Sequence, residues 1–264
     1  MADPEDTRGQ AGAAREADPR HAAAAELHDR LAVLLSEHDR EAAVRTAVEA
    51  VAAGVIGIGE LYRDVLSPLL SRTGEAWQHG RVRVWEEHFA SAVVRTIVEI
   101  LYPGVLKVKA SVPPAGRSVL LACPPEENHD LGLRMVADRF DMAGWTTYFL
   151  GADTPAGDLI DAARRLGVDA VVLSSSTHFH RVALRRHVDL LKHELGSVHV
   201  WVGGPAFRHG SDGWTEAEIV DLDELLGGPR EPVVGEHGDH GEHRDHGDHG
   251  AHDRDVVEPG EDEG

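Results

Sequence analysis

The stretch that decides the fold reads SVLLACPPEENHDLG, residues 118–132, in which a short apolar run enters a loop that begins with paired prolines. Similar apolar runs follow it, separated by amphipathic segments. The runs lie at 118–122, 146–150, 170–173 and 198–202, and the amphipathic segments at 131–143, 156–166 and 182–195. Continuous apolarity, in place of strict alternation, indicates strands that helices cover on both faces. We therefore expect a Rossmann-like parallel sheet over residues 118–226, built from right-handed crossover units.

Helical spacing of apolar residues precedes this region. Four segments show it, at 27–35, 43–51, 58–77 and 84–102, and glycines or the Pro103-Gly104 pair mark the expected helix ends. An antiparallel four-helix bundle over residues 21–106 buries all four apolar faces. The predicted fold class is thus α/β, a helical bundle followed by a Rossmann-like domain. Residues 107–117, with Pro113-Pro114 and Gly116, form the predicted linker.

The two ends of the chain have a different composition. Residues 1–20 mix charged residues, glycine and alanine without an apolar stripe, which is typical of a disordered lead-in. Residues 227–264 are acidic and lack a periodic core pattern, and their histidines recur at every third position from His237 to His252. We expect this disordered tail to bind metal ions weakly, without a fixed site. Its removal should leave ligand binding intact.

Composition excludes several functions. The chain has 264 residues, a formal net charge of -20 and one cysteine, Cys123. A single cysteine excludes an internal disulfide framework and multi-cysteine metal sites. The acidic balance argues against direct nucleic-acid binding. Because no secretory signal opens the chain and no run approaches about 20 consecutive apolar residues, we expect a cytosolic protein without a membrane span.

Polar residues gather where the predicted strands end, which is where an open parallel sheet binds its ligands. Glu127 and His129 follow the first strand, hydroxyl groups follow the third at residues 174–177, and Gly203-Gly204 follows the fourth. A neutral imidazole is a good metal ligand, and a carboxylate two residues away can hold the proton of its other ring nitrogen. The other interpretation of His129, as a surface residue that begins the next helix, is the ordinary one for a lone histidine.

These motifs resemble the cobalamin-binding domain shared by methionine synthase, corrinoid mutases and CarH-type photoreceptors. The family pattern is Asp-x-His-x-x-Gly, then Ser-x-Leu, then Gly-Gly. Here Glu127-x-His129-x-x-Gly132 precedes Ser174-x-Ser176 by 41 intervening residues, and 26 residues separate Ser176 from Gly203. Glu for Asp and Ser for Leu are departures. The resemblance implies that His129 ligates cobalt from the lower face of the cofactor. It also implies a slot for the cofactor's dimethylbenzimidazole arm, and the predicted binding residues of this lower half are Glu127, His129, Asp130, Gly132, Ser174, Ser176, Thr177, Gly203 and Gly204.

A second resemblance concerns the bundle. Trp77, followed after nine residues by Glu87-His88, is similar to the signature with which CarH-type sensors enclose the adenosyl group of adenosylcobalamin. Those DNA-binding regulators carry a histidine directly after the tryptophan, where this chain has Gln78. The sequence therefore does not identify the upper cobalt ligand after illumination. A module without a DNA-reading domain also resembles the photocobilins, which implies biliverdin as a possible second pigment. Cys123 is interpreted as a core thiol and not as a pigment attachment point.

The resemblance implies a cobalamin-dependent light sensor and not an enzyme. Photolysis of adenosylcobalamin would change its conformation, its homo-oligomeric assembly or its contact with a protein partner. A corrinoid methyl carrier and a cobalamin storage or delivery module are the alternatives, because both need the same lower face. A catalytic mutase is disfavoured because 264 residues leave no room for a substrate barrel.

Overall fold

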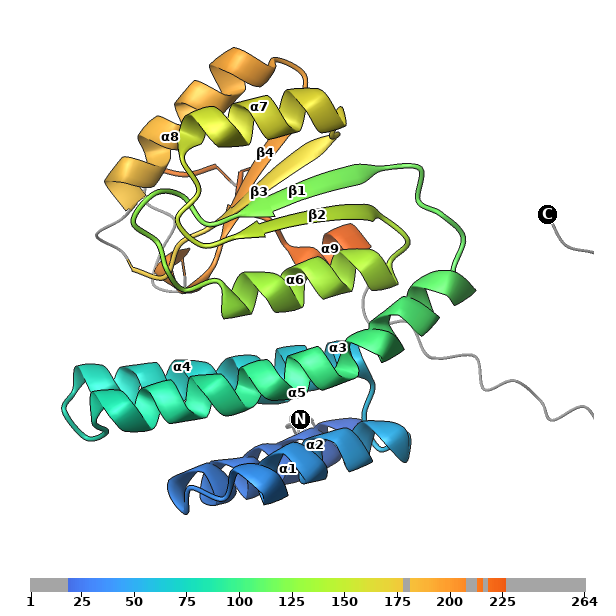
Figure 1. Ribbon diagram of the computed structural model, residues 1–264, viewed down its shortest axis with the longest axis vertical. Coiled ribbons are helices and arrows are strands. Elements are labelled where there is room, and N and C mark those ends of the chain that lie inside the picture. Colours follow the sequence, from blue (N-terminus) through green and yellow to red (C-terminus); the bar gives the residue numbers. More distant parts are fainter. Residues whose placement is uncertain (1–18, 178–180, 208–212, 216–217, 227–264) are drawn as a thin grey trace, which may run out of the picture. The chain divides into compact units, whose positions relative to one another are not determined.

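The computed structural model describes residues 19–177, 181–207, 213–215 and 218–226. The lead-in before residue 19 and the predicted metal-binding tail at 227–264 lie outside these ranges. Within them, the predicted fold class is confirmed: helices come first, and a parallel four-stranded sheet follows. Figure 1 shows the two regions.

The bundle consists of α1 (Pro19–Ser36), α2 (Arg40–Ala52), a third rod and α5 (Val84–Ser111). The third rod is continuous, from α3 (Ile58–Glu60) through the π-helical η1 (Leu61–Leu66) to α4 (Ser67–Gln78). Pro68 accounts for the irregular turn, because proline has no N–H to donate to the preceding turn. Tyr62 and Val65 of η1 are fully buried in the bundle core.

The expected end of the last bundle helix was wrong. Helix α5 continues through Pro103 and ends at Ser111, so residues 107–111 are helical and the connection to the sheet is shorter than the predicted linker. Gly104 does not end the helix but allows close packing. A Cβ atom there would lie 2.8 Å from Ile58 Cδ1, so glycine lets α5 approach α3 closely.

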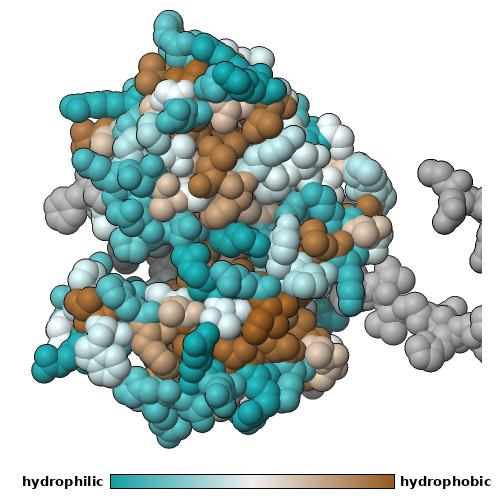
Figure 2. Space-filling model, in the orientation of Figure 1, coloured by the Kyte–Doolittle hydropathy of each residue, from teal (hydrophilic) through white to brown (hydrophobic). Residues whose placement is uncertain are grey.

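Helix α5 is also long and apolar enough to suit a membrane span by length and composition, with a mean hydropathy of 1.5. In this fold many of its apolar side chains belong to the bundle core. Val93, Val94, Ile97 and Val98 are at most 1% exposed and belong to the bundle core. Ile100 and Leu106 are exposed, and Figure 2 shows apolar groups among hydrophilic ones over the bundle.

The sheet contains β1 (Ser118–Ala122), β2 (Thr146–Gly151), β3 (Ala170–Ser174) and β4 (His199–Gly203), each within one residue of its predicted bounds. All pairings are parallel, in the order β2-β1-β3-β4. Strand β2 therefore lies on one side of β1, and the chain then crosses to the other side of β1 to form β3. The carboxyl ends of β1 and β3 form the switch point where such sheets bind ligands.

Helices cover both faces of the sheet (Figure 1). Helices α7 (Ala156–Leu166) and α8 (Arg181–Leu195) pack on one face, and α6 (Leu131–Met142) and α9 (Leu222–Leu226) pack on the other. The segment after β4, which the sequence left undecided between strand and helix, makes one parallel bridge from Ile219 to Val202 before α9 begins. Cys123 is completely buried, as expected of a core thiol, and burial raises its pKa to about 12.

The bundle meets the sheet domain along α6. Leu131 and Met135 of α6 join the hydrophobic core of the bundle. Tyr62 donates a hydrogen bond of 3.0 Å to the buried carboxylate of Asp138, which also pairs with Arg134. Burial raises the pKa values of both Tyr62 and Asp138. A buried network of this kind favours one register of α6 against the bundle.

Candidate cobalamin site

The loop after β1 holds His129 in one orientation. The Nδ1 atom of His129 donates to Oε1 of Glu127 at 2.6 Å, and the backbone N–H of His129 donates to the same oxygen at 3.0 Å. The Glu127 side chain is 1% exposed, whereas that of His129 is 72% exposed. With the proton on Nδ1, the lone pair of Nε2 is available to a ligand outside the loop.

Glu127 also ties this loop to the loop after β3. Its Oε2 accepts hydrogen bonds from the backbone N–H of Ser176 at 2.7 Å and from the Ser176 hydroxyl at 2.8 Å. Burial opposes ionisation of Glu127, but the hydrogen bonds from His129 and Ser176 outweigh it and hold its pKa at about 2. The switch point of the sheet thus carries a fixed carboxylate beneath an exposed imidazole.

The pKa of His129 is raised, chiefly by its hydrogen bond to Glu127 and further by the carboxylates of Glu87 and Asp130. The contribution of Glu87 is informative because this residue belongs to α5 of the bundle. Its charge therefore acts on the predicted lower ligand from the other domain. Of the residues predicted for the upper face, Glu87 is thus close enough to raise the pKa of His129.

The remaining predicted lower-half residues line the same strand ends. Ser174 is 8% exposed at the end of β3, and Gly203 ends β4. A Cβ atom on Gly132 would meet no atom within 4 Å, so this glycine borders open space. The hydroxyl of Thr177 is buried and has no hydrogen-bond partner among the described residues. The open space at Gly132 and the unpaired hydroxyl of Thr177 would each be available to the nucleotide arm of a cobalamin.

Gly204 is a predicted binding residue, and the packing of the neighbouring loops also requires glycine at this position. Its φ is +100°, and a Cβ atom there would lie 2.5 Å from the carbonyl oxygen of Ser175 and 2.8 Å from the hydroxyl of Ser174. Only glycine permits this approach. Gly204 therefore packs the loop after β4 against the serine loop, and this packing brings Ser174 and Ser175 to the switch point.

The predicted upper-face residues are only partly together. Trp77 and His88 line one open cavity of about 850 Å³ at the turn between α4 and α5, together with Trp85, Arg81 and neighbouring residues. Glu87 does not line this cavity. Its carboxylate accepts a hydrogen bond from Ser91 at 2.7 Å and lies 3.6 Å from Nε2 of His88. The Trp77 side chain is substantially exposed, and the whole residue is 44% accessible.

His79, the histidine nearest to the position of Gln78, is engaged in its own helix. Its Nδ1 lies 2.7 Å from the carbonyl oxygen of Glu75 at the end of α4. His79 therefore does not replace the upper-ligand histidine that the DNA-binding regulators carry at the position of Gln78.

Sequence reasoning missed two residues that shape the site. Asp153, in the loop after β2, accepts a hydrogen bond from the backbone N–H of Glu126 and donates its own N–H to the carbonyl of Glu127. Arg95 of α5 pairs with Asp130 at 2.7 Å. Asp153 follows a strand end, a position that could have identified it, whereas nothing in the local sequence around Arg95 points to Asp130.

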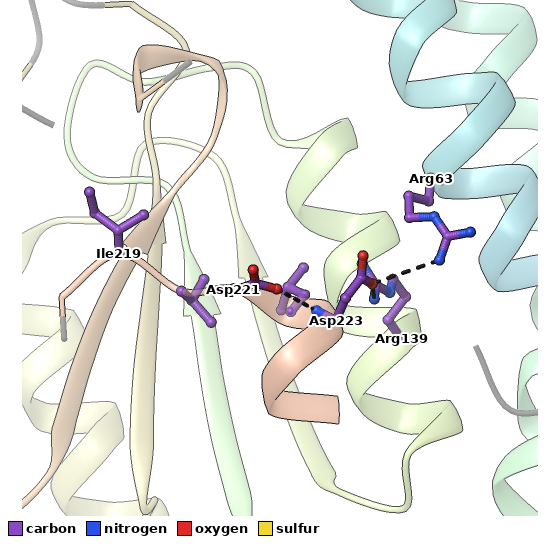
Figure 3. Close-up of a pocket in the computed structure, with 7 residues that line it drawn as sticks. Arg63, Arg139, Ile219, Asp221 and Asp223 are labelled. Atoms are coloured by element: carbon purple, nitrogen blue, oxygen red, sulfur yellow. Dashed lines mark hydrogen bonds and ion pairs between the residues drawn. The ribbon is translucent and has the colours of Figure 1, made fainter. Parts of the chain in front are cut away.

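A second cavity, of about 330 Å³, is drawn in Figure 3. Arg63 of η1 lies 3.8 Å from Asp223 of α9, and Arg139 of α6 pairs with the same carboxylate. Both arginines are thus paired within the protein. Asp221 also lines this cavity, and its carboxylate accepts hydrogen bonds from the backbone N–H groups of Asp223 and Glu224. Among the described residues, no three His, Cys, Asp or Glu side chains are grouped as a site for a metal ion.

Comparisons with known proteins identify B12 binding domains in both regions of the chain. Residues 117–224 match a family described as B12 binding domain, and residues 27–102 match a second family with the same description. The HTH-type transcriptional repressor CarH of Myxococcus xanthus is 35% identical over 149 residues, which are 56% of this chain and 48% of CarH. The chain thus spans about half the length of that relative.

Corrinoid proteins are also similar. Trimethylamine corrinoid protein 2 of Methanosarcina acetivorans is 24% identical over 193 residues, covering 71% of this chain and 85% of that protein. The solved structure of Methanosarcina barkeri monomethylamine corrinoid protein shares the fold, with a TM-score of 0.63, 20% identity, and coverage of 77% of this chain and 96% of that one. The two family matches and the geometry of His129 support a cobalamin-binding protein, built from a helical and a parallel-sheet B12 binding domain.

Proposed function

We propose that this chain is a cobalamin-dependent light sensor that binds adenosylcobalamin between its bundle and its sheet domain. The observation that carries the cofactor assignment is the exposed imidazole of His129, fixed by the buried carboxylate of Glu127. Bound adenosylcobalamin supplies a cobalt–carbon bond that light breaks. His129 would hold the lower face, and Gly132 at the start of α6, with Ser174 and Thr177 at the end of β3 and just after it, would receive the nucleotide arm.

The upper half supports adenosylcobalamin over other corrinoids. Trp77 and His88 line an open cavity, and an exposed indole offers a flat apolar surface on which an adenine ring stacks. Loss of the adenosyl group would leave this surface without its contact. In our proposal the bundle then shifts against α6, and the shift alters assembly or a partner contact.

The test uses the full chain loaded with adenosylcobalamin in darkness. We expect green light to change its absorbance irreversibly and to change its hydrodynamic size. Protein loaded with hydroxocobalamin, which has no light-sensitive cobalt–carbon bond of this kind, is the matched control and should keep its size. Photolysis without any change of mass or shape would favour storage or delivery and would contradict the sensor.

A corrinoid methyl carrier is the second candidate, because the similarity to trimethylamine corrinoid protein 2 extends over 85% of that protein. The two candidates differ in the upper ligand they favour. A sensor of the proposed kind binds adenosylcobalamin more tightly than methylcobalamin, whereas a carrier has no use for an adenosyl pocket. Competition between these two forms of the vitamin for the dark protein separates the candidates.

Biliverdin remains a prediction from the resemblance to photocobilins. No described residue identifies a bilin site. Addition of biliverdin to the corrinoid-loaded chain tests it, because a bound bilin adds a far-red absorption band that cobalamin lacks.

A further inference from the structure

The interface between α5 and α6 has an ion pair near each end. Arg95 of α5 pairs with Asp130, directly before α6, at 2.7 Å. Lys109 of α5 pairs with Asp141, near the end of α6, at 2.6 Å. Leu131 and Met135 pack in the bundle core between them. The two pairs join the same two helices, but only the first adjoins the loop that carries His129.

Asp130 occupies the N-cap position of α6 without making the usual capping bond. An aspartate at this position ordinarily accepts a hydrogen bond from a backbone N–H in the first turn, and that bond stabilises the helix. Here the side chain makes no cap hydrogen bond, and its Oδ1 pairs with Arg95 instead. Its Oδ2 faces Gly151, where a Cβ atom would lie 3.5 Å away. The carboxylate is thus directed to the bundle at the expense of its own helix.

Arg95 lies on the helix that also carries the predicted upper-face residues. Glu87 is eight residues earlier on α5, which corresponds to about 12 Å along a helix. His129 immediately precedes Asp130 in the ligand loop. One rigid helix therefore connects the upper-face turn to the residue next to the lower ligand.

We propose that Arg95 is a positioning residue for His129: by holding Asp130, it ties α5 to the ligand loop and keeps the imidazole under the corrin. This inference rests on the proposed cobalamin site, but not on light sensing. A displacement of α5 must either break the Arg95–Asp130 pair or pull the ligand loop. The pair is thereby a direct side-chain link between α5 and the residue next to His129.

The experiment compares Arg95→Gln with Lys109→Gln in the full chain, using hydroxocobalamin as the probe. Both substitutions remove one part-exposed ion pair between the same helices, so both should lower the melting temperature by a similar small amount. We expect Arg95→Gln to weaken hydroxocobalamin binding about threefold to fivefold, which corresponds to the free energy of one part-exposed ion pair. Lys109→Gln should leave the affinity unchanged. Arg95→Lys, which keeps the charge, should restore most of the affinity.

Two further readouts separate positioning from a general loss of stability. The reduced, cobalt(II) form of the bound vitamin reports its axial nitrogen by electron paramagnetic resonance. We expect Arg95→Gln to lower the fraction with a histidine nitrogen bound and Lys109→Gln to keep it. Asp130→Asn and the Arg95→Gln/Asp130→Asn double variant complete a cycle, in which the two single effects should not add.

Equal loss of affinity in Arg95→Gln and Lys109→Gln would overturn the proposal, as would additive effects in the cycle. If Arg95→Gln does not fold, Asp130→Asn and Arg95→Lys still give the comparison, and normal histidine ligation in Asp130→Asn would overturn it. A wild-type chain that binds no hydroxocobalamin would refute the proposed function itself. That outcome is visible before any variant is measured.

Discussion

The loop cluster around His129 and the turn around Trp77 face the same proposed ligand but are built differently. Glu127 is buried and bound by two loops, so His129 is oriented by the protein alone. At the turn between α4 and α5, Trp77 and His88 are exposed, and Glu87 bonds within its own helix. The lower half is held by hydrogen bonds between its loops, whereas the side chains of the upper half are largely exposed.

This difference suits a device that must retain its cofactor while responding to a change on one side of it. In the proposed sensor, a preorganised lower ligand would cost little free energy to bind and would hold the corrin before and after photolysis. The exposed upper surface would lose its contact when the upper ligand is lost.

The largest effect is expected for His129→Ala. Removal of the imidazole deletes the cobalt ligand itself, so corrinoid affinity should fall by more than about 100-fold, since even the outer partners of a metal ligand are typically worth 10- to 100-fold. Equilibrium dialysis against hydroxocobalamin measures the change. Retained affinity and an unaltered spectrum would remove the ligand assignment.

Glu127→Gln should reduce corrinoid affinity by about 10- to 100-fold, because a neutral amide no longer fixes the proton on Nδ1 of His129. The amide also lacks the second acceptor oxygen that Ser176 uses through its N–H and hydroxyl. Titration with hydroxocobalamin and circular dichroism separate lost binding from lost fold. Glu126→Gln, at the neighbouring exposed position, is the matched control and should bind normally.

Alanine substitution of two glycines with positive φ, one in each half, compares how tightly the backbone of each half is constrained. Gly204→Ala places a Cβ atom 2.5 Å from the Ser175 carbonyl, whereas a Cβ atom on Gly80, at φ +69° in the upper turn, meets nothing within 4 Å. Gly204→Ala should lower the free energy of unfolding by about 1–3 kcal/mol more than Gly80→Ala does. Urea denaturation of the free protein measures both. Equal losses would mean that the lower half is not the more tightly constrained one.

Trp77→Ala should act on ligand choice and hardly on stability, because the residue is 44% exposed. We expect the preference for adenosylcobalamin over hydroxocobalamin to fall about tenfold, the equivalent of one stacking contact. Competition binding in darkness measures the ratio. A variant that loses affinity for both forms equally would show that Trp77 supports the bundle and not the upper ligand.

The smallest effect is expected from removal of residues 228–264. This segment adds charge and histidines but none of the residues assigned to either half, so corrinoid affinity and spectrum should stay unchanged. Absorbance of the reconstituted truncated chain checks this. Loss of the cofactor spectrum would show that the tail takes part in the site.

Much of the lower half could be predicted from sequence because its motifs stand directly after strands. A buried strand has a clear apolar signature, and parallel topology then brings its carboxyl end to the common edge. Glu127, His129 and Ser176 were placed together on that basis, and their side chains are in contact. Spacing between motifs, in addition to residue type, made the prediction specific.

The upper half and the domain interface were harder to predict, for physical reasons. Glu87 and His88 are adjacent in sequence, but on a helix they point about 100° apart, and only His88 reaches the cavity. The Pro103-Gly104 pair looks like a helix end, yet packing against Ile58 keeps the helix intact. The Arg95–Asp130 pair spans 35 positions and depends on how α5 lies on α6. Such tertiary contacts leave no local signal.

The most direct test of the account uses protein labelled with nitrogen-15 histidine and the cobalt(II) form of unlabelled cobalamin. An axial nitrogen-14 splits each cobalt resonance into a triplet, whereas nitrogen-15 gives a doublet. If His129 is the lower ligand, labelled wild-type protein gives doublets, and unlabelled protein gives triplets. Triplets from the labelled protein would show that the vitamin's own benzimidazole still holds the metal, which would contradict the account.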